Sequence, residues 1–176
     1  MRILGIDPGS LLTGYGVIDI KGNHNRYVTC GTLSLKTLTM PARLQLIYET
    51  ISEIITEYKP DEFAIERVFV GKNSDSALKL GHARGVAMCA ASMAGLEVSE
   101  YAPREIKLAA TGSGSADKTQ VQHMVKVLLG LNKSPSEDAA DALAIAICHA
   151  HHSSAPAIKL QQRIAVGSNR KLAENQ

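Results

Sequence analysis

Four acidic residues hold positions that suit metal-assisted chemistry. Asp7 ends the apolar segment 2–6 and precedes a Pro-Gly turn, and Glu66 ends another short apolar segment. Asp138 and Asp141 are three positions apart in an alanine-rich segment, so on a helix they lie on the same face. Burying a carboxylate is costly unless it is paired or binds a cation. The four acids together therefore predict a metal site with oxygen ligands.

The ligand chemistry indicates which metal and which reaction to expect. Carboxylates without an accompanying Cys or His cluster favour Mg²⁺ or Mn²⁺. Two such ions roughly 4 Å apart stabilise both the attacking and the leaving oxygen in phosphodiester hydrolysis. The alternative for Asp7 is a turn residue that bonds its own backbone. The alternative for Glu137 and Asp138 is a favourable interaction with a helix dipole. Neither alternative accounts for all four acids.

The elements that must position these acids follow from hydrophobic spacing and turn residues. The order of elements predicts an α/β domain in which an antiparallel meander of three strands is followed by parallel strands joined through helices. Ligand crevices in such sheets lie at strand ends. The predicted strands are residues 2–6, 14–18, 26–35, 61–66 and 97–101, and the predicted helices are 41–58, 74–94, 103–110, 118–129 and 134–149.

Composition is that of an ordinary globular domain. The chain has 176 residues, of which 45% are hydrophobic and 20% charged. No apolar run approaches the roughly 20 residues of a membrane helix, and the N-terminus lacks the features of a signal peptide, so we expect a cytoplasmic protein. Cys30, Cys89 and Cys148 are an odd number and far apart, which predicts free, buried thiols in a reducing compartment.

The chain divides by composition into a domain, residues 1–152, and a tail, residues 153–176. The tail is rich in Ser, Ala and Gln, has no clear period and is expected to be flexible. It is also basic, whereas the domain is nearly balanced in charge. Its charged residues are Lys159, Arg163, Arg170, Lys171 and Glu174. The net charge of +2 does not by itself indicate a polyanionic partner.

Two further segments are distinctive by composition. The predicted helix 74–94 is rich in Ala and Gly, including Gly81 and Gly85, and these small residues fit either packing on the sheet or a subunit interface. Residues 111–117 are rich in Gly and Ser and are predicted to form a flexible loop.

Four segments resemble the RuvC family of bacterial Holliday junction resolvases, which are ribonuclease-H-like nucleases. They are residues 6–16 (IDPGSLLTGYG), 64–66 (AIE), 73–81 (NSDSALKLG) and 138–144 (DAADALA), and the resemblance extends from residue 2 to about residue 150. It implies a mixed five-stranded sheet flanked by helices. It also implies a homodimer that cuts two opposed strands of a four-way DNA junction with Mg²⁺ during recombination and repair. A RuvA–RuvB branch-migration complex is the implied partner.

The resemblance also implies roles for individual residues. Asp7, Glu66, Asp138 and Asp141 match the catalytic, metal-binding acids of the family, although some relatives have His at the position of Asp138. The remaining candidates bind DNA: Phe69, Lys107 and Lys118 match family positions. Weaker candidates for backbone contacts are Lys72, Lys79, Arg84 and Arg104.

Each of these DNA-binding candidates has a plain alternative. Phe69 suits stacking on an unstacked base, and its alternative is a core side chain. Lys118 begins a helix, where backbone N–H groups favour phosphate. The alternative for the lysines is an ordinary solvated surface position.

Other functions are compatible with parts of the sequence. YqgF-type nucleases, which process ribosomal RNA precursors, share the early Asp-Pro-Gly stretch but not segments 73–81 and 138–144. Actin-like sugar kinases also begin with a strand, an Asp and a Gly-rich turn, but they need a second domain. A junction-binding module without activity is the third alternative, which the presence of all four acids disfavours. His149, His151 and His152 allow a metal site, although His is also favoured at a helix end.

Overall fold

A computed structural model describes residues 1–22, 24–68 and 74–153. Its centre is a five-stranded sheet with the strand order β3-β2-β1-β4-β5. Strands β1, β2 and β3 form an antiparallel meander, while β4 and β5 continue the sheet parallel to β1. The predicted mixed sheet is therefore confirmed. The strands are β1 (Arg2–Asp7), β2 (Leu12–Lys21), β3 (His24–Ser34), β4 (Glu62–Glu66) and β5 (Val98–Tyr101).

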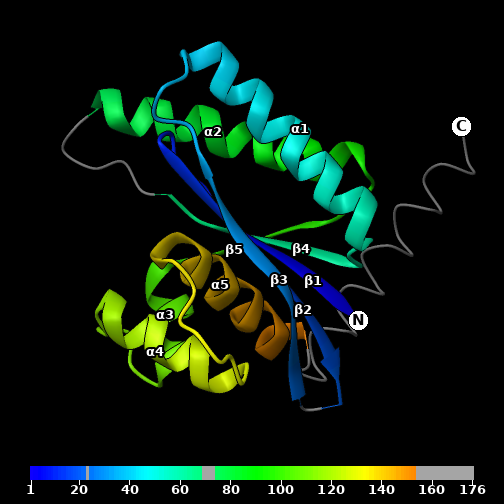
Figure 1. Ribbon diagram of the computed structural model, residues 1–176, viewed down its shortest axis with the longest axis vertical. Helices are drawn as coiled ribbons and strands as arrows, with labels where there is room; N and C mark the ends of the chain where they lie inside the picture. The colour runs from blue at the N-terminus through cyan, green and yellow to red at the C-terminus, as the bar shows by residue number, and fades with distance from the viewer. Residues whose placement is uncertain (23, 69–73, 154–176) are drawn as a thin grey trace, which may run out of the picture.

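Helices cover both faces of the sheet (Figure 1). One face carries α1 (Met40–Tyr58) and α2 (Ser74–Met93), and the other carries α3 (Pro103–Thr111), α4 (Lys118–Leu128) and α5 (Glu137–Ser153). The sheet separates two hydrophobic cores. All ten predicted elements are present, with bounds within a few residues of those expected from the sequence.

The alternation of side chains along β1 and β4 decides which way the acids face. Successive side chains of a strand point to opposite faces. Ile3 packs in the core of α3, α4 and α5, whereas Leu4 packs in the core of α1 and α2. Ala64 similarly faces the α5 side. Asp7 and Glu66 therefore lie on the face of the sheet that α5 covers.

Helix α5 packs unusually close to the sheet. Nearly all of its residues from Ala139 to Ala150 are buried, and many are alanine. A Cβ atom on Gly5 would lie 2.3 Å from the carbonyl oxygen of Ala142, and one on Gly14 would lie 2.0 Å from that of Asp138. No side chain fits at these two positions, and the absent side chains bring the first turn of α5 next to the end of β1.

The connection between α3 and α4 is held by its own side chains. The Thr111 hydroxyl donates to the carbonyl of Ser113 at 3.0 Å and accepts from its N–H at 3.1 Å, and the Ser113 and Ser115 hydroxyls lie 3.1 Å apart. The carboxylate of Asp117 then accepts a hydrogen bond from the Gln120 N–H at 2.8 Å, which caps α4. The loop that was expected to be flexible thus contains side-chain hydrogen bonds of its own.

Other expectations have mixed outcomes. The three cysteines are free thiols, as predicted, but only Cys148 is buried: Cys30 is half-buried and Cys89 is exposed. Within the described ranges, no helix has the length and apolar character needed to cross a membrane. The predicted tail, residues 153–176, lies outside the described residues apart from Ser153.

Candidate active site

Three of the four predicted acids line one cavity. Asp7 ends β1 and Glu66 ends β4, and these parallel strands are neighbours in which Ile6 pairs with Ile65. Asp141 reaches the same place from the start of α5. The cavity has a volume of about 280 Å³ and is also lined by Lys107 of α3, Lys118 of α4 and four other residues, which are Pro103, Ile106, Val121 and Ile145.

The acids in the cavity disfavour one another's ionised form. Burial raises the pKa of Asp7 to about 8, and the negative charges of Glu66, Asp141 and Asp138 contribute to this shift. Burial also raises the pKa of Glu66, with a further contribution from Asp141. The pKa of Asp141 is raised for the same reason, burial first. Such opposed carboxylates form a site that gains stability when a cation enters it.

Asp138 has a different environment from the other three acids. It is half-buried in the first turn of α5 and does not line the cavity. Its charge nevertheless raises the pKa of both Asp7 and Asp141. The structure therefore brings three predicted acids together and places the fourth at their margin.

Two lysines face the acids from helices α3 and α4. Lys118 forms an ion pair with Glu137 and lies 3.9 Å from a carboxylate oxygen of Asp141. Its hydrogen bond with Glu137 is the main cause of its raised pKa. Lys107 is half-buried. Its positive charge partly offsets the rise in the pKa of Glu66 and Asp141 that burial causes. Both lysines thus line the cavity, although the Lys118 side chain is 64% exposed.

The donor set fits Mg²⁺ or Mn²⁺. Within residues 1–22, 24–68 and 74–153, no three Asp, Glu, His or Cys side chains are already grouped closely enough to hold a metal ion. Mg²⁺ does not require such a cage, because it retains several waters and binds through one or two carboxylates together with substrate phosphates. Oxygen-only donors with raised pKa values around one cavity suit an ion of this kind.

Comparison with known proteins identifies the family. The family model described as "Crossover junction endodeoxyribonuclease RuvC" matches residues 3–149. The chain belongs to the RuvC family. RuvC from Shewanella frigidimarina is 60% identical over 149 residues, covering 85% of this chain and 86% of the relative. RuvC from Dichelobacter nodosus is 58% identical over 151 residues, covering 86% of each chain.

Solved RuvC structures share the fold. The structure described as Thermus thermophilus RuvC in complex with Holliday junction substrate has a TM-score of 0.81 and 34% identity, covering 87% of this chain and 94% of its own. The yeast mitochondrial Holliday junction resolvase Ydc2 has a TM-score of 0.62 at 13% identity over 83% of this chain and 76% of its own, which shows a common fold. The match to the RuvC model over residues 3–149 favours RuvC over the YqgF-type and kinase alternatives.

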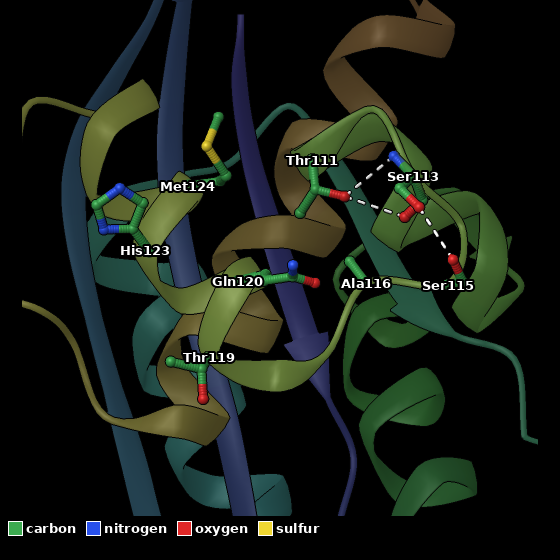
Figure 2. A pocket seen from close by; sticks show the side chains of 8 residues that line it. All are labelled: Thr111, Ser113, Ser115, Ala116, Thr119, Gln120, His123 and Met124. Carbon is green, nitrogen blue, oxygen red and sulfur yellow. Dashed lines mark hydrogen bonds between the residues drawn. The ribbon is translucent and has the colours of Figure 1, made fainter.

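Two DNA-binding candidates expected from the RuvC resemblance lie outside the described residues. These are Phe69 and Lys72, which follow Glu66 in the sequence. A larger hollow of about 720 Å³ adjoins the α3–α4 connection and is lined mainly by hydroxyl and amide side chains, among them Thr111, Ser115 and Gln120 (Figure 2). It contains none of the four acids.

Sequence analysis missed the environment of His149. This residue is buried, at 5% exposure, instead of standing at an open helix end. Its Nδ1 lies 2.7 Å from the Tyr101 hydroxyl, and its Nε2 lies 2.6 Å from the Glu62 carboxylate. The sequence signal that could have indicated this was the position of His149 in an otherwise apolar helix. His149 therefore ties α5 to β4 and β5.

Proposed function

We propose that this RuvC family member is a crossover junction endodeoxyribonuclease, which resolves four-way DNA junctions by hydrolysing two opposed strands during recombination and repair. One observation carries the proposal: carboxylates from β1, β4 and α5 meet in one cavity that two lysines flank. This is the arrangement expected for metal-assisted phosphodiester hydrolysis. The Thermus thermophilus relative, described in complex with a Holliday junction substrate, supports the choice of DNA.

The residues of the cavity divide into two groups by charge. Asp7, Glu66 and Asp141, with Asp138 at the margin, would hold two Mg²⁺ ions, for which Mn²⁺ would substitute. When bound, the ions supply a water of lowered pKa and stabilise the leaving oxygen. Before DNA arrives, the acids repel phosphate.

Positive side chains offset this repulsion. Lys107 and Lys118 attract the scissile phosphate and hold it above the acids. Phe69 would stack on an unpaired base near the junction centre, and Lys72 would contact the DNA backbone.

Paired incision calls for two sites, and helix α2 has a suitable surface for joining two copies. Gly81 and Gly85 are exposed, and apart from its chain neighbours and the adjacent helix backbone, a Cβ atom at either position would meet no atom within 4 Å. Leu78 and Met93 on the same helix are 60% and 71% exposed. Two-fold pairing through this face would give a homodimer whose sites are related by symmetry, as two opposed strands require. A RuvA–RuvB branch-migration complex would supply the junction.

The decisive experiment compares cleavage of a synthetic four-way junction with cleavage of linear duplex DNA and RNA. We expect paired nicks in the junction with Mg²⁺ or Mn²⁺, binding without efficient cutting in Ca²⁺, and no cutting in EDTA. Ca²⁺ fails because its larger, looser coordination shell positions the reacting oxygens poorly. Asp7→Asn should bind the junction and not cut it.

Three outcomes would contradict parts of the proposal. Full activity in EDTA would exclude the metal-dependent reaction, and preference for RNA would favour the YqgF-type alternative. Junction binding without cleavage in any metal would favour a binding module. Light scattering at the working concentration tests the dimer separately.

A further inference from the structure

Arg84 connects helix α2 to the strand end that carries Glu66. Its Nε donates a hydrogen bond to the main-chain carbonyl oxygen of Glu66 at 3.0 Å, and its Nη2 pairs with the carboxylate of Glu100 on β5. The Arg84 side chain is only 17% exposed. Its position is therefore set by contacts with the ends of β4 and β5 and not by solvent.

The peptide unit between Glu66 and Arg67 is held from both sides. Its carbonyl accepts the hydrogen bond from Arg84, and its N–H donates to the carbonyl of Tyr101 at 2.7 Å. A peptide unit is planar, so bonds at its two ends fix the dihedral angles on either side of it. One of these angles belongs to Glu66, and it helps to determine where the Glu66 carboxylate points.

The acceptors that surround Arg84 are themselves fixed. Glu100 and Tyr101 pair with Ile65 and Glu66 in the parallel register of β4 and β5. The Tyr101 hydroxyl is bonded to the buried His149. Arg84 therefore adds a side-chain restraint at a strand end where the regular pairing of β4 with β5 stops, beside the bond of 3.4 Å from Arg67 Nη2 to the Glu100 carbonyl.

We infer that Arg84, oriented by Glu100, is a positioning residue for Glu66. It holds the peptide that follows this acid, so that the Glu66 carboxylate is presented to the cavity in a geometry that binds metal. The inference rests on the proposed function, because it assigns Arg84 a role in that same site. It also makes α2 part of the active site, although no side chain of α2 lines the cavity.

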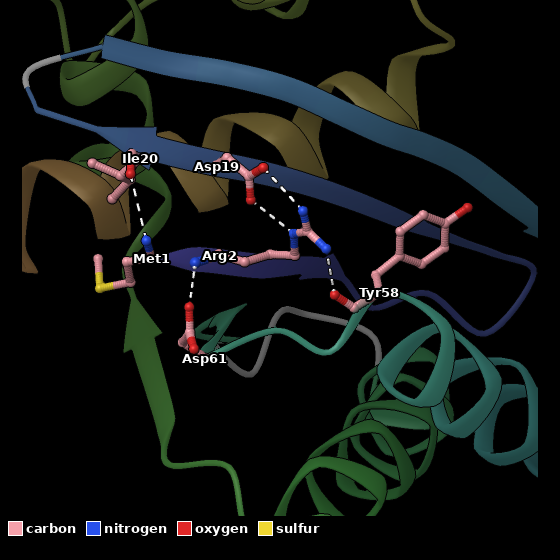
Figure 3. Close-up of polar contacts among 6 residues, drawn as sticks. All are labelled: Met1, Arg2, Asp19, Ile20, Tyr58 and Asp61. Carbon is pink, nitrogen blue, oxygen red and sulfur yellow. Dashed lines mark hydrogen bonds and ion pairs between the residues drawn. The ribbon is translucent and has the colours of Figure 1, made fainter.

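A second arginine provides a matched control. Arg2 bonds one carboxylate, that of Asp19, at 2.7 and 3.0 Å, and one main-chain carbonyl, that of Tyr58, at 2.7 Å (Figure 3). Its pattern of partners is that of Arg84. Arg2, however, begins β1, whereas Asp7 ends it. Arg2 therefore lies at the opposite end of the strand from the cavity.

The experiment compares Arg84→Met, Arg84→Lys and Glu100→Gln with Arg2→Met. Three quantities are measured: melting temperature in EDTA, the rise in melting temperature of the DNA-free protein over a Mn²⁺ titration, and the Mg²⁺ concentration that gives half-maximal junction cleavage. Both Met variants should melt lower in EDTA. Of these two variants, Arg84→Met should weaken the metal response, by roughly 10-fold in the metal concentration required, and Arg2→Met should leave it unchanged.

The other variants sharpen the test. Lys keeps the charge but lacks the planar fork that reaches two acceptors, so Arg84→Lys should shift the metal response by an intermediate amount. Glu100→Gln should shift it in the same direction, because it leaves Arg84 without a carboxylate partner.

Equal metal responses in Arg84→Met and Arg2→Met would overturn the inference, and so would a normal response in Arg84→Lys if Arg84→Met fails to fold. If the unaltered protein does not cut junctions, the proposed function fails, while the Mn²⁺ melting series still tests Arg84.

Discussion

Replacing Asp7 by Asn should stabilise the metal-free protein while abolishing cleavage. Asn has nearly the same shape as Asp, and it removes a charge that the cavity disfavours. The pKa of Asp7 is raised from 3.8 to about 8, mainly by burial and then by the neighbouring acids. The folded protein therefore holds a proton that the unfolded chain releases at neutral pH.

The size of the effect follows from this difference in pKa. Below pH 3.8 the Asp7 carboxyl is protonated in both the folded and the unfolded state, so it does not lower the free energy of unfolding. As pH rises toward 8, the free energy of unfolding falls by about 1.4 kcal/mol per pH unit. At pH 7 the loss is on the order of 4 kcal/mol. In a domain of this size that corresponds to roughly 10 °C in melting temperature.

Melting curves in EDTA at a series of pH values provide the assay. Asp7→Asn should melt higher than the parent at pH 7, and the difference should vanish near pH 4. Asp19→Asn is the control with the opposite sign, because its hydrogen bonds with Arg2 lower the pKa of Asp19. An Asp7→Asn variant that melts no higher than the parent at pH 7 would refute the reasoning.

Three further substitutions test other parts of the structure. Lys118→Ala should slow cleavage. It should also reduce, by about one unit, the slope of the logarithm of the junction-binding constant against the logarithm of salt concentration, and an unchanged slope would show that Lys118 makes no phosphate contact. Gly85→Leu should give a folded monomer in light scattering, because a Cβ atom there would have no atom within 4 Å apart from its chain neighbours and the adjacent turns of helix backbone; an intact dimer would exclude this face. Gly14→Ala should lower stability by roughly 1–3 kcal/mol, since its Cβ would lie 2.0 Å from the Asp138 carbonyl; denaturant unfolding measures this.

The convergence of Asp7 and Glu66 was predictable because each ends an apolar segment, and strand ends gather such residues at one edge of a sheet. Their common face follows from the register of β1 with β4 and was not predicted. The inward position of Asp141 was predictable from the spacing of Asp138 and Asp141 on one face of an alanine-rich helix. These signals need no knowledge of distant contacts, and the structure brings all three residues to one cavity.

Partners that are far apart in sequence were not predictable in this way. Lys118 pairs with Glu137, 19 positions away, and His149 with Glu62, 87 positions away. Helix α2 is rich in small residues on all sides, so its pattern does not indicate which face is buried. Consequently, the sequence alone could not assign Arg84 to the end of β4.

The late position of α5 in the chain has a consequence for synthesis. The ribosome makes the whole sheet and four helices before α5, which supplies Asp141 and much of one core. Until then, the glycine-bearing face of β1 and β2 has no covering helix. A nascent or truncated chain thus has no complete cavity, and it exposes apolar strands that favour aggregation and proteolysis. A fragment that ends before α5 therefore also lacks Asp138 and Asp141.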